Sequence, residues 1–279
     1  MDDHFEVDWT EAADRLASAA RTDADWYRSV AAVLVTPGDR VAVDVGCGGG
    51  GMAAVLAAAI GAQGRVVGVD GAADVLDRAR AMAAGTVEFV EADLHHGMAP
   101  LRDVVPDGAD VVWASASVHH LGDQQAAVDE LAALLRPGGR LALAEGGLTA
   151  RHLPYDVGVG EPGLEGRLQA ANEAWFNGMR ARLPGSVRMP YGWSAALRRA
   201  GLTSVTSRSW LLEPAPDPTA ITDKFAHRVP RLHELGLLTD ADAATWRTLL
   251  DPSAPEWLGT RDDLFHVEAR TVHWGTRSR

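Results

Sequence analysis

The sequence predicts an α/β fold in which helices cover both faces of a doubly wound, mostly parallel sheet of seven strands. Five apolar runs alternate with helical segments, at 40–46, 65–70, 86–92, 109–115 and 140–145. Each run is continuous rather than alternating, as strands buried on both faces should be. Two further strands are expected near 202–212 and 265–275. The last one alternates in polarity, which suits an antiparallel edge strand on a parallel sheet.

The helices follow from apolar spacing. Two short helices are expected before the first strand, and the second places Trp26, Val30 and Leu34 on one face. Helical segments between the strands lie at 49–61, 72–84 and 123–135. Because strands that alternate with helices form right-handed crossovers, the carboxyl ends of the strands should share one edge of the sheet. Ligands bind at that edge in folds of this class.

The pattern changes after Gly147, and we expect three parts. Residues 1–147 form the N-terminal helices and a ligand-binding core. Residues 148–191 form a cap insertion, with apolar residues from Leu164 to Leu183 at helical spacing. Residues 192–279 complete the sheet and carry a helical insertion at 214–264, with the helix over 219–250 interrupted at Pro230.

Composition narrows the class of protein. The net charge of −12 over 279 residues argues against sequence-independent nucleic-acid binding, which needs a basic surface. A single cysteine, Cys47, excludes an intramolecular disulfide. No basic apolar leader is visible, and the longest apolar stretch, residues 52–62, is too short to span a bilayer. We therefore expect a soluble cytoplasmic protein, monomeric or homodimeric, that binds neither nucleic acid nor membrane.

Acidic residues end the first three strands, and a glycine-rich turn follows the first. Asp44, Asp70 and Asp93 should meet at one edge of the sheet. Asp70 lies 20 residues after Gly50, the spacing at which a carboxylate binds the two hydroxyls of a ribose. The glycines alone fit two patterns, the dinucleotide fingerprint and D-x-G-x-G-x-G. A carboxylate two residues before the turn favours a cationic ligand over a pyrophosphate.

Together these stretches resemble the class I S-adenosylmethionine-dependent methyltransferases, in particular small-molecule members of an actinobacterial type. The matching segments are 43–50, 67–70, 91–94, 117–121 and 135–140, in the order of that family. The resemblance covers residues 26–146 and implies a Rossmann-like sheet with S-adenosylmethionine as cofactor and S-adenosylhomocysteine as product. Gly71 and the two alanines after it depart from relatives that carry a larger residue over the adenine.

The resemblance also implies site residues. Asp44 and the turn formed by Gly46, Cys47, Gly48 and Gly50 would hold the methionine end of the cofactor. Further along, the implied cofactor residues are Asp70 and Gly71 at the ribose, Asp93 and Leu94 at the adenine, and Ala114 and Ser115 beside the sulfonium. Tyr27, on an N-terminal helix, is a further candidate that would close over the cofactor, with core packing as the competing interpretation.

Three histidines are candidates for a general base. His119 and His120 follow the fourth strand and would face the methyl group, while His152 follows the fifth. A packing role is the competing interpretation for each of them. Adjacent histidines point apart and no carboxylate cluster completes a ligand set, so we expect no metal.

Aromatic and cationic residues in or near the cap are candidates for substrate binding: Tyr155, Trp175, Arg180, Arg188, Tyr191 and Trp193. An aromatic pocket with one or two fixed charges is typical of small-molecule sites. The leading interpretation is methylation of a small molecule, for instance a natural product, on oxygen more than on nitrogen or carbon. The alternatives are a short peptide or a carboxylate as methyl acceptor, and an NAD(P)-dependent oxidoreductase.

Overall fold

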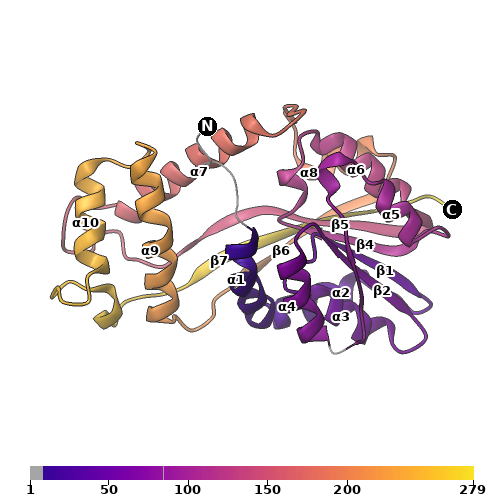
Figure 1. Ribbon diagram of the computed structural model, residues 1–279, viewed down its shortest axis with the longest axis horizontal. Coiled ribbons are helices and arrows are strands. Elements are labelled where there is room, and N and C mark those ends of the chain that lie inside the picture. The colour runs from indigo at the N-terminus through magenta and orange to yellow at the C-terminus, as the bar shows by residue number, and fades with distance from the viewer. Residues whose placement is uncertain (1–8, 84) are drawn as a thin grey trace. The chain divides into compact units, whose positions relative to one another are not determined.

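The computed structural model describes residues 9–83 and 85–279, and within them the strands form one seven-stranded sheet of order β3-β2-β1-β4-β5-β7-β6 (Figure 1). The strands are β1 (Val41–Val45), β2 (Arg65–Asp70), β3 (Glu88–Glu91), β4 (Ala109–Ser115), β5 (Leu135–Arg151), β6 (Thr203–Leu212) and β7 (Val267–Thr276). The predicted fold class, a Rossmann-like and mostly parallel sheet with an antiparallel strand near one edge, is confirmed.

Strands β1 to β5 pair in parallel, with β1 at the centre between β2 and β4. The last strand, β7, runs the other way. Gly138 of β5 bonds Arg277 at the end of β7, and Gly147 of β5 lies against Ala269 of β7, so residue numbers rise along β5 as they fall along β7. The bond of Ser207 to His273 and that of Ser209 to Thr271 show that β7 is also antiparallel to β6. Strand β7 lies between β5 and β6, so the antiparallel strand expected at the edge is one position inside it, and β6 is the edge strand on this side of the sheet.

The fifth strand is longer than the apolar run that predicts it. The Pro-Gly-Gly segment, which precedes the predicted run at 140–145, belongs to β5 as a bulge: Ala109 pairs with Leu135, while Val111 pairs with Arg140. Between these two pairs the chain advances five residues along β5 but only two along β4. A bulge of this kind bends and twists the strand. The strand also continues past its predicted end at residue 145 to Arg151.

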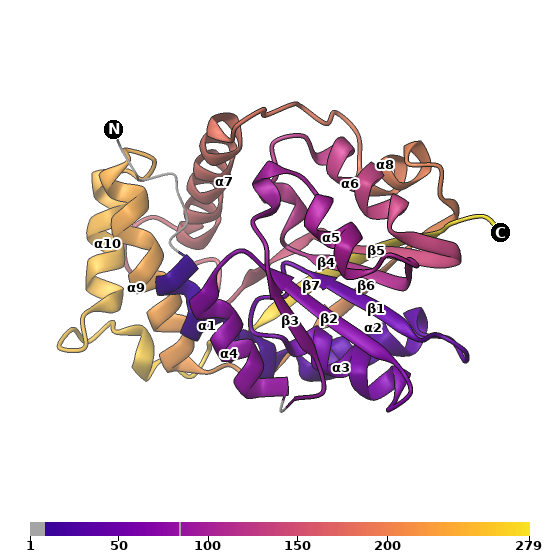
Figure 2. The ribbon, with the colours of Figure 1, turned by 45° about the vertical axis from the view of Figure 1, so that its right-hand side comes forward.

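The helices near the parallel strands are α1 (Trp9–Thr22), α2 (Ala24–Leu34), α3 (Gly51–Ile60), α4 (Ala73–Ala83), α5 (Ala99–Val104), α6 (Gln124–Ala133) and α8 (Trp193–Arg199). Figures 1 and 2 show α2, α3 and α4 on one face of this sheet and α5, α6 and α8 on the other. Alternate strand residues supply the two faces. Val43 and Val67 pack in the cluster with α5, α6 and α8, while the ring of Trp113 lies 6.0 Å from that of Trp26 in α2.

The chain divides into two compact units. The core unit contains the described residues up to Gly146, with Leu183–Ser209 and Thr271–Arg279. The helical unit contains Gly147–Arg182 and Trp210–Arg270. The helical unit therefore contains part of the predicted cap and all of the predicted insertion at 214–264. That the predicted cap chooses the substrate stays a prediction.

Three long helices build the helical unit: α7 (Leu164–Arg182), α9 (Pro218–Glu234) and α10 (Asp240–Leu250). Helices α9 and α10 lie side by side, with the rings of Phe225 and Trp246 4.5 Å apart (Figure 1). The predicted interruption at Pro230 is wrong, because α9 continues through it. Buried neighbours such as Val229 and Leu232 offset the one hydrogen bond that proline removes. The break comes after residue 234, where Gly236 has a φ of +67°.

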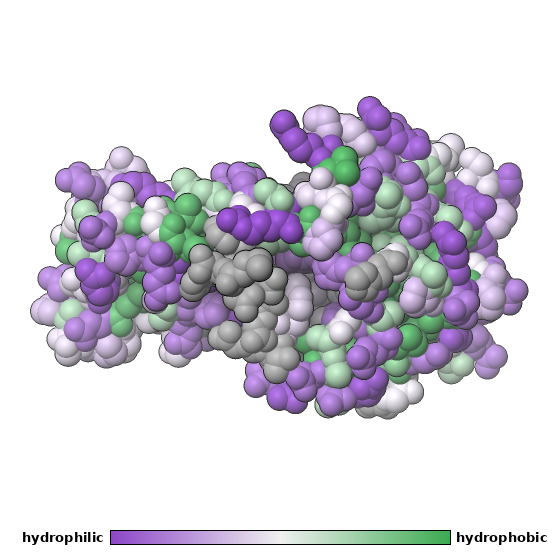
Figure 3. Space-filling model, turned by 45° about the horizontal axis from the view of Figure 1, so that its top comes forward, coloured by the Kyte–Doolittle hydropathy of each residue, from purple (hydrophilic) through white to green (hydrophobic). Residues whose placement is uncertain are grey.

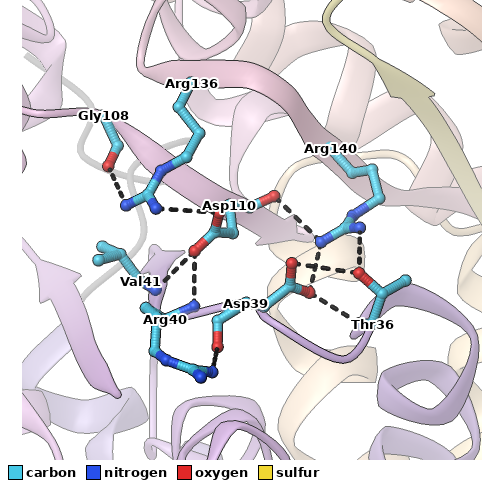
Figure 4. A network of polar contacts seen from close by, with 8 residues as sticks. All are labelled: Thr36, Asp39, Arg40, Val41, Gly108, Asp110, Arg136 and Arg140. Atoms are coloured by element: carbon cyan, nitrogen blue, oxygen red, sulfur yellow. Dashed lines mark hydrogen bonds and ion pairs between the residues drawn. The ribbon is translucent and has the colours of Figure 1, made fainter. Parts of the chain in front are cut away.

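An ion-pair network closes the amino ends of β1 and β4. Asp110 is 8% exposed and accepts hydrogen bonds from the backbone N–H groups of Arg40 and Val41, at 2.6 and 2.9 Å. Figure 4 shows its carboxylate also facing Arg136, with Arg140 beside Asp39. This network holds the amino ends of the two central strands together. It lies at the opposite end of these strands from their carboxyl ends.

Polar residues dominate the visible surface. On the face shown in Figure 3, hydrophilic side chains surround small, separate groups of hydrophobic ones among the described residues. No helix within residues 9–83 and 85–279 is long and apolar enough to cross a membrane.

Candidate functional site

A cavity of about 350 Å³ opens in the core unit at the carboxyl ends of β1, β2 and β4. This volume lies at the lower end of the range for small-molecule sites. Its wall includes Trp9, Leu16, Val45, Gly46, Gly48, Asp70, Gly71, Ala72, Asp93, Leu94, His95, Met98, Ser115, Ser117, Val118, His120 and Leu121. The structure thus brings together seven of the predicted cofactor residues and one of the predicted catalytic histidines.

The glycine turn forms one side of this cavity. Gly46, Gly48 and Gly50 have φ angles of +66°, +51° and +76°, a region that residues with a side chain rarely adopt. A Cβ on Gly46 would also lie 2.5 Å from the Cβ of Ser117. Glycine is therefore required at position 46 for both reasons, and the bare backbone is left facing the cavity.

Asp70 stands at the end of β2 and fixes the turn from the other side. Its Oδ2 accepts a hydrogen bond from the backbone N–H of Gly48 at 3.0 Å, and its Oδ1 accepts one from Ala72 at 3.2 Å. Burial raises the pKa of this carboxyl, and these backbone hydrogen bonds work against the rise. A carboxylate has about four acceptor positions, so two remain for the hydroxyl groups of a diol in the cavity.

Beyond Asp70 the wall becomes apolar. Leu94, Met98 and Val118 offer the flat hydrophobic surface that a heteroaromatic ring needs. Asp93 lies at the rim and is partly engaged, because its Oδ1 accepts from the backbone N–H of His95 at 2.9 Å. The side chain of Asp93 is 53% exposed.

Five predicted cofactor residues do not line the cavity: Asp44, Cys47, Gly50, Ala114 and Tyr27. Asp44 is only 2% exposed, and its Oδ2 has no hydrogen-bond partner among the described residues. Burial raises the pKa of Asp44 to about 7. An unpartnered acceptor two residues before the turn fits a ligand that brings a positively charged donor. Burial also raises the pKa of Cys47, which makes this thiol a poor nucleophile.

The two adjacent histidines face different partners. The Nδ1 of His119 lies 2.7 Å from Oε2 of Glu145, a residue that is 3% exposed at the carboxyl end of the core part of β5. The other oxygen of Glu145 accepts the backbone N–H groups of Ser117 and Val118, at 3.0 and 2.9 Å. His120 lines the cavity, and its ring meets the ring of Trp9 edge to face at 5.0 Å.

His152, the third predicted catalytic residue, belongs to the helical unit. It is 2% exposed, and its Nδ1 lies 3.0 Å from Oε1 of Glu165. Within residues 9–83 and 85–279 no group of three or more His, Cys, Asp or Glu side chains could hold a metal ion.

The predicted substrate residues divide between the two units. Tyr155, Trp175 and Arg180 lie in the helical unit, where Tyr155 is 73% exposed and Trp175 is buried under the guanidinium of Arg231. Burial lowers the pKa of Arg180.

The other three, Arg188, Tyr191 and Trp193, lie in the core unit but are not on the wall of the cavity. The hydroxyl of Tyr191 donates to Gln125, and Trp193 packs against the core as the first residue of α8. Tyr191 and Trp193 therefore have packing and hydrogen-bonding contacts within the core unit.

Several residues of the cavity wall were not predicted from the sequence. Trp9 and Leu16 lie seven residues apart on one face of α1, and this spacing is their only signal. Met98, Val118 and Leu121 are apolar residues without a functional group that a sequence motif could identify. Glu145 had a usable signal, since it is an acid that follows an apolar strand run, as Asp44 and Asp70 do.

Comparison with known proteins decides the family. The model of a methyltransferase domain matches residues 43–143. Over 218 residues the chain is 38% identical to the methyltransferase GfsG of Streptomyces halstedii, covering 78% of this chain and 71% of that protein. The chain belongs to the class I S-adenosylmethionine-dependent methyltransferases. The solved structure of an O-methyltransferase family protein from Burkholderia thailandensis shares the fold, with a TM-score of 0.51, 19% identity, and coverage of 98% of this chain and 61% of that one.

Coverage varies among the relatives. The chain is 34% identical over 146 residues to an uncharacterized protein in transposon TN4556 of Streptomyces fradiae, a match that covers 50% of this chain and 41% of that protein. Membership of this family identifies the cofactor as S-adenosylmethionine. The alternative interpretation, an NAD(P)-dependent oxidoreductase, is therefore rejected. The glycine pattern alone had left both open.

Proposed function

We propose that this protein transfers the methyl group of S-adenosylmethionine to a small organic molecule, with oxygen as the acceptor atom. The observation that supports the proposal most is the cavity in which the glycine turn, Asp70 and the apolar wall around Leu94 meet. Each of these surfaces suits one part of the cofactor. The sulfonium of the bound cofactor supplies an activated methyl group, so the chain's own residues have to bind, orient and exclude water.

In the proposed arrangement the backbone of Gly46 and Gly48 lies against the methionine part. Asp70 accepts hydrogen bonds from the ribose hydroxyls with the acceptor positions that Gly48 and Ala72 leave unused. Leu94 and Met98 pack on the adenine. The carboxylate of Asp44 pairs with the positively charged amino group of the cofactor, and this contact would also give Oδ2 of Asp44 a hydrogen-bond partner.

The three histidines have different proposed roles. His119 is a positioning residue, because its Nδ1 is engaged by Glu145 and together they fix the segment 117–120. His120 and Trp9 shape the open side of the cavity. A hydroxyl acceptor needs a proton acceptor, and of the three predicted histidines His120 is the one on the wall of the cavity.

The test is cofactor binding followed by a search for the acceptor. Thermal unfolding would be followed with S-adenosylmethionine, S-adenosylhomocysteine, NAD and NADP. A ligand present at 100 times its dissociation constant adds about 2.7 kcal/mol to the free energy of unfolding. We expect this shift with the first two compounds alone. Hydroxylated, amine and carboxylate compounds would then be screened for release of S-adenosylhomocysteine, and release with amines or carboxylates but no hydroxyl compound would contradict the choice of oxygen.

A further inference from the structure

Two side chains on the cavity wall of the core unit, Asp93 and His95, contact each other, and the proposed arrangement gives this contact no role. Oδ1 of Asp93 lies 2.9 Å from the backbone nitrogen of His95 and 2.8 Å from Nδ1 of its imidazole. Both nitrogens belong to one residue, and they converge on one carboxylate oxygen. The side chains of Asp93 and His95 are 53% and 42% exposed, so the pair lies where the wall of the cavity meets solvent.

The local sequence explains why this contact forms. Asp93 is the N-cap of a short 3₁₀ helix, Leu94–His96, which follows β3. An aspartate at such a position accepts the backbone N–H of the residue two places later. Gly97 ends the helix with a φ of +111°, and its N–H donates to the carbonyl of Leu94 at 3.2 Å. The turn is therefore closed at both ends, and His95 is held beside the carboxylate.

The two nitrogens of His95 fix the orientation of the carboxylate. An ionised carboxylate only accepts hydrogen bonds, so Nδ1 carries the hydrogen and donates it to Oδ1 of Asp93. Rotation of the carboxylate about its Cβ–Cγ bond would move Oδ1 away from both donors at once. The second oxygen, Oδ2, is therefore held in one place as well.

A carboxylate that is held in this way can distinguish two kinds of purine. A 6-aminopurine presents an amino donor next to the acceptor N1, whereas a 6-oxopurine presents a carbonyl acceptor next to the donor N1–H. A carboxylate that rotates can accept from either edge. A fixed one pairs with the amino group but faces the lone pairs of the carbonyl, which costs affinity. Leu94 and Met98, also on the wall, are apolar and pack on both purines alike.

We propose that His95 is a positioning residue for cofactor selection. By holding Asp93, it makes the cavity select the 6-aminopurine ring of S-adenosylmethionine over the 6-oxopurine ring of a deaminated analogue. The inference rests on the proposed function, in which the adenine packs on Leu94 and Met98. Asp93 accepts a hydrogen bond from the amino group of the adenine, and His95 acts through Asp93.

The first experiment compares two ligands that differ only in the substituent at position 6 of the purine and the hydrogen on N1. Calorimetric titration measures the dissociation constants of S-adenosylhomocysteine and of its deaminated analogue, S-inosylhomocysteine. We expect the wild-type protein to bind the first about tenfold more tightly or better, the scale of one hydrogen bond to a charged group. Equal affinities would overturn the inference and leave the proposed function standing. A protein that binds neither compound would refute both.

Variants of His95 test the positioning role. His95→Phe keeps a flat ring but has no donor, so the preference for the amino compound should fall by about threefold or more. His95→Asn places an amide N–H close to the position of Nδ1 and should restore the preference to within about twofold of wild type. His233→Phe is the matched control and should change nothing, because His233 also pairs with an exposed aspartate, Asp240, and is not on the cavity wall. Equal weakening of both ligands in His95→Phe would show a merely structural role and contradict the inference.

Substitutions of Asp93 test whether His95 acts through it. Asp93→Ala should abolish the preference, and adding His95→Phe should then change it no further, because the two side chains share one interaction. Asp93→Asn is the sharper test. The two N–H donors of His95 hold the amide oxygen in the place of Oδ1, which turns the amide NH₂ to the place of Oδ2. This variant should bind S-inosylhomocysteine at least as tightly as S-adenosylhomocysteine, and a preference as in the wild type would overturn the inference.

Discussion

His119 and Glu145 are joined by a contact of 2.7 Å between Nδ1 and Oε2, and Glu145 is buried at 3% exposure. The same carboxylate accepts two backbone N–H groups of the segment that carries His119 and His120. One acidic residue of β5 therefore shapes the part of the cavity wall that follows β4. This relationship makes His119 a support of the site, whereas its neighbour His120 lies on the wall of the cavity.

Replacing Glu145 should weaken both the fold and the site. Glu145→Gln removes the charge that strengthens three hydrogen bonds, each worth about 1.5–3 kcal/mol when a charged group takes part. We expect a lower urea midpoint and a weaker affinity for S-adenosylmethionine, measured by calorimetric titration. Glu91→Gln, at an exposed strand end, serves as the control and should change neither quantity. Unchanged affinity in Glu145→Gln would separate this residue from the site.

Asp70 should matter for the cofactor far more than Asp77, an exposed acid on the helix that follows β2. Asp70→Ala removes the acceptors for the ribose and the support of Gly48, so we expect the dissociation constant to rise at least tenfold, or about 1.4 kcal/mol. The control is Asp77→Ala on α4, where a surface ion pair with Arg80 is lost. Calorimetric titration of both variants decides the matter, and equal affinities would refute the assignment of Asp70.

The buried carboxyl of Asp44 should make the stability of the unliganded protein depend on pH. Its pKa rises from 3.8 to about 7 on folding, chiefly through burial, so the folded state binds the proton more tightly than the unfolded state. The contribution is then fully present below pH 4 and is lost as the pH rises through 7, by an amount on the order of 4 kcal/mol. Asp44→Asn should flatten this part of the profile. Urea unfolding between pH 5 and 8 measures it, and parallel profiles for the two proteins would contradict the prediction.

The network at the amino ends of β1 and β4 should carry stability without affecting the site directly. Asp110→Ala leaves the N–H groups of Arg40 and Val41 without their acceptor and Arg136 without its partner. Breaking a buried pair of this kind costs about 3 kcal/mol. Chemical unfolding should show this loss, while Asp107→Ala in the exposed preceding turn should show almost none. Under conditions where the Asp110→Ala variant is folded, its affinity for S-adenosylmethionine should equal that of the wild-type protein.

The sequence by itself determined the order of the strands along the chain, the parallel core and the residues at its carboxyl edge. Continuous apolar runs report burial on both faces, and Asp70 or Gly46 can be identified because turn geometry and strand ends impose residue types locally. It also indicated the apolar face of α7, which the structure buries from Leu164 to Met179.

Only the tertiary structure decided which of these residues share a surface. His119 and His120 are neighbours in sequence and their ring centroids lie 4.3 Å apart, yet His119 bonds Glu145 while His120 lines the cavity. Pro230 lies inside α9 because packing around Phe225 and Val229 outweighs the local preference of proline. Lys224 meets His152 across 72 positions of sequence, and no local pattern carries such information, since contacts of this range depend on how whole elements pack.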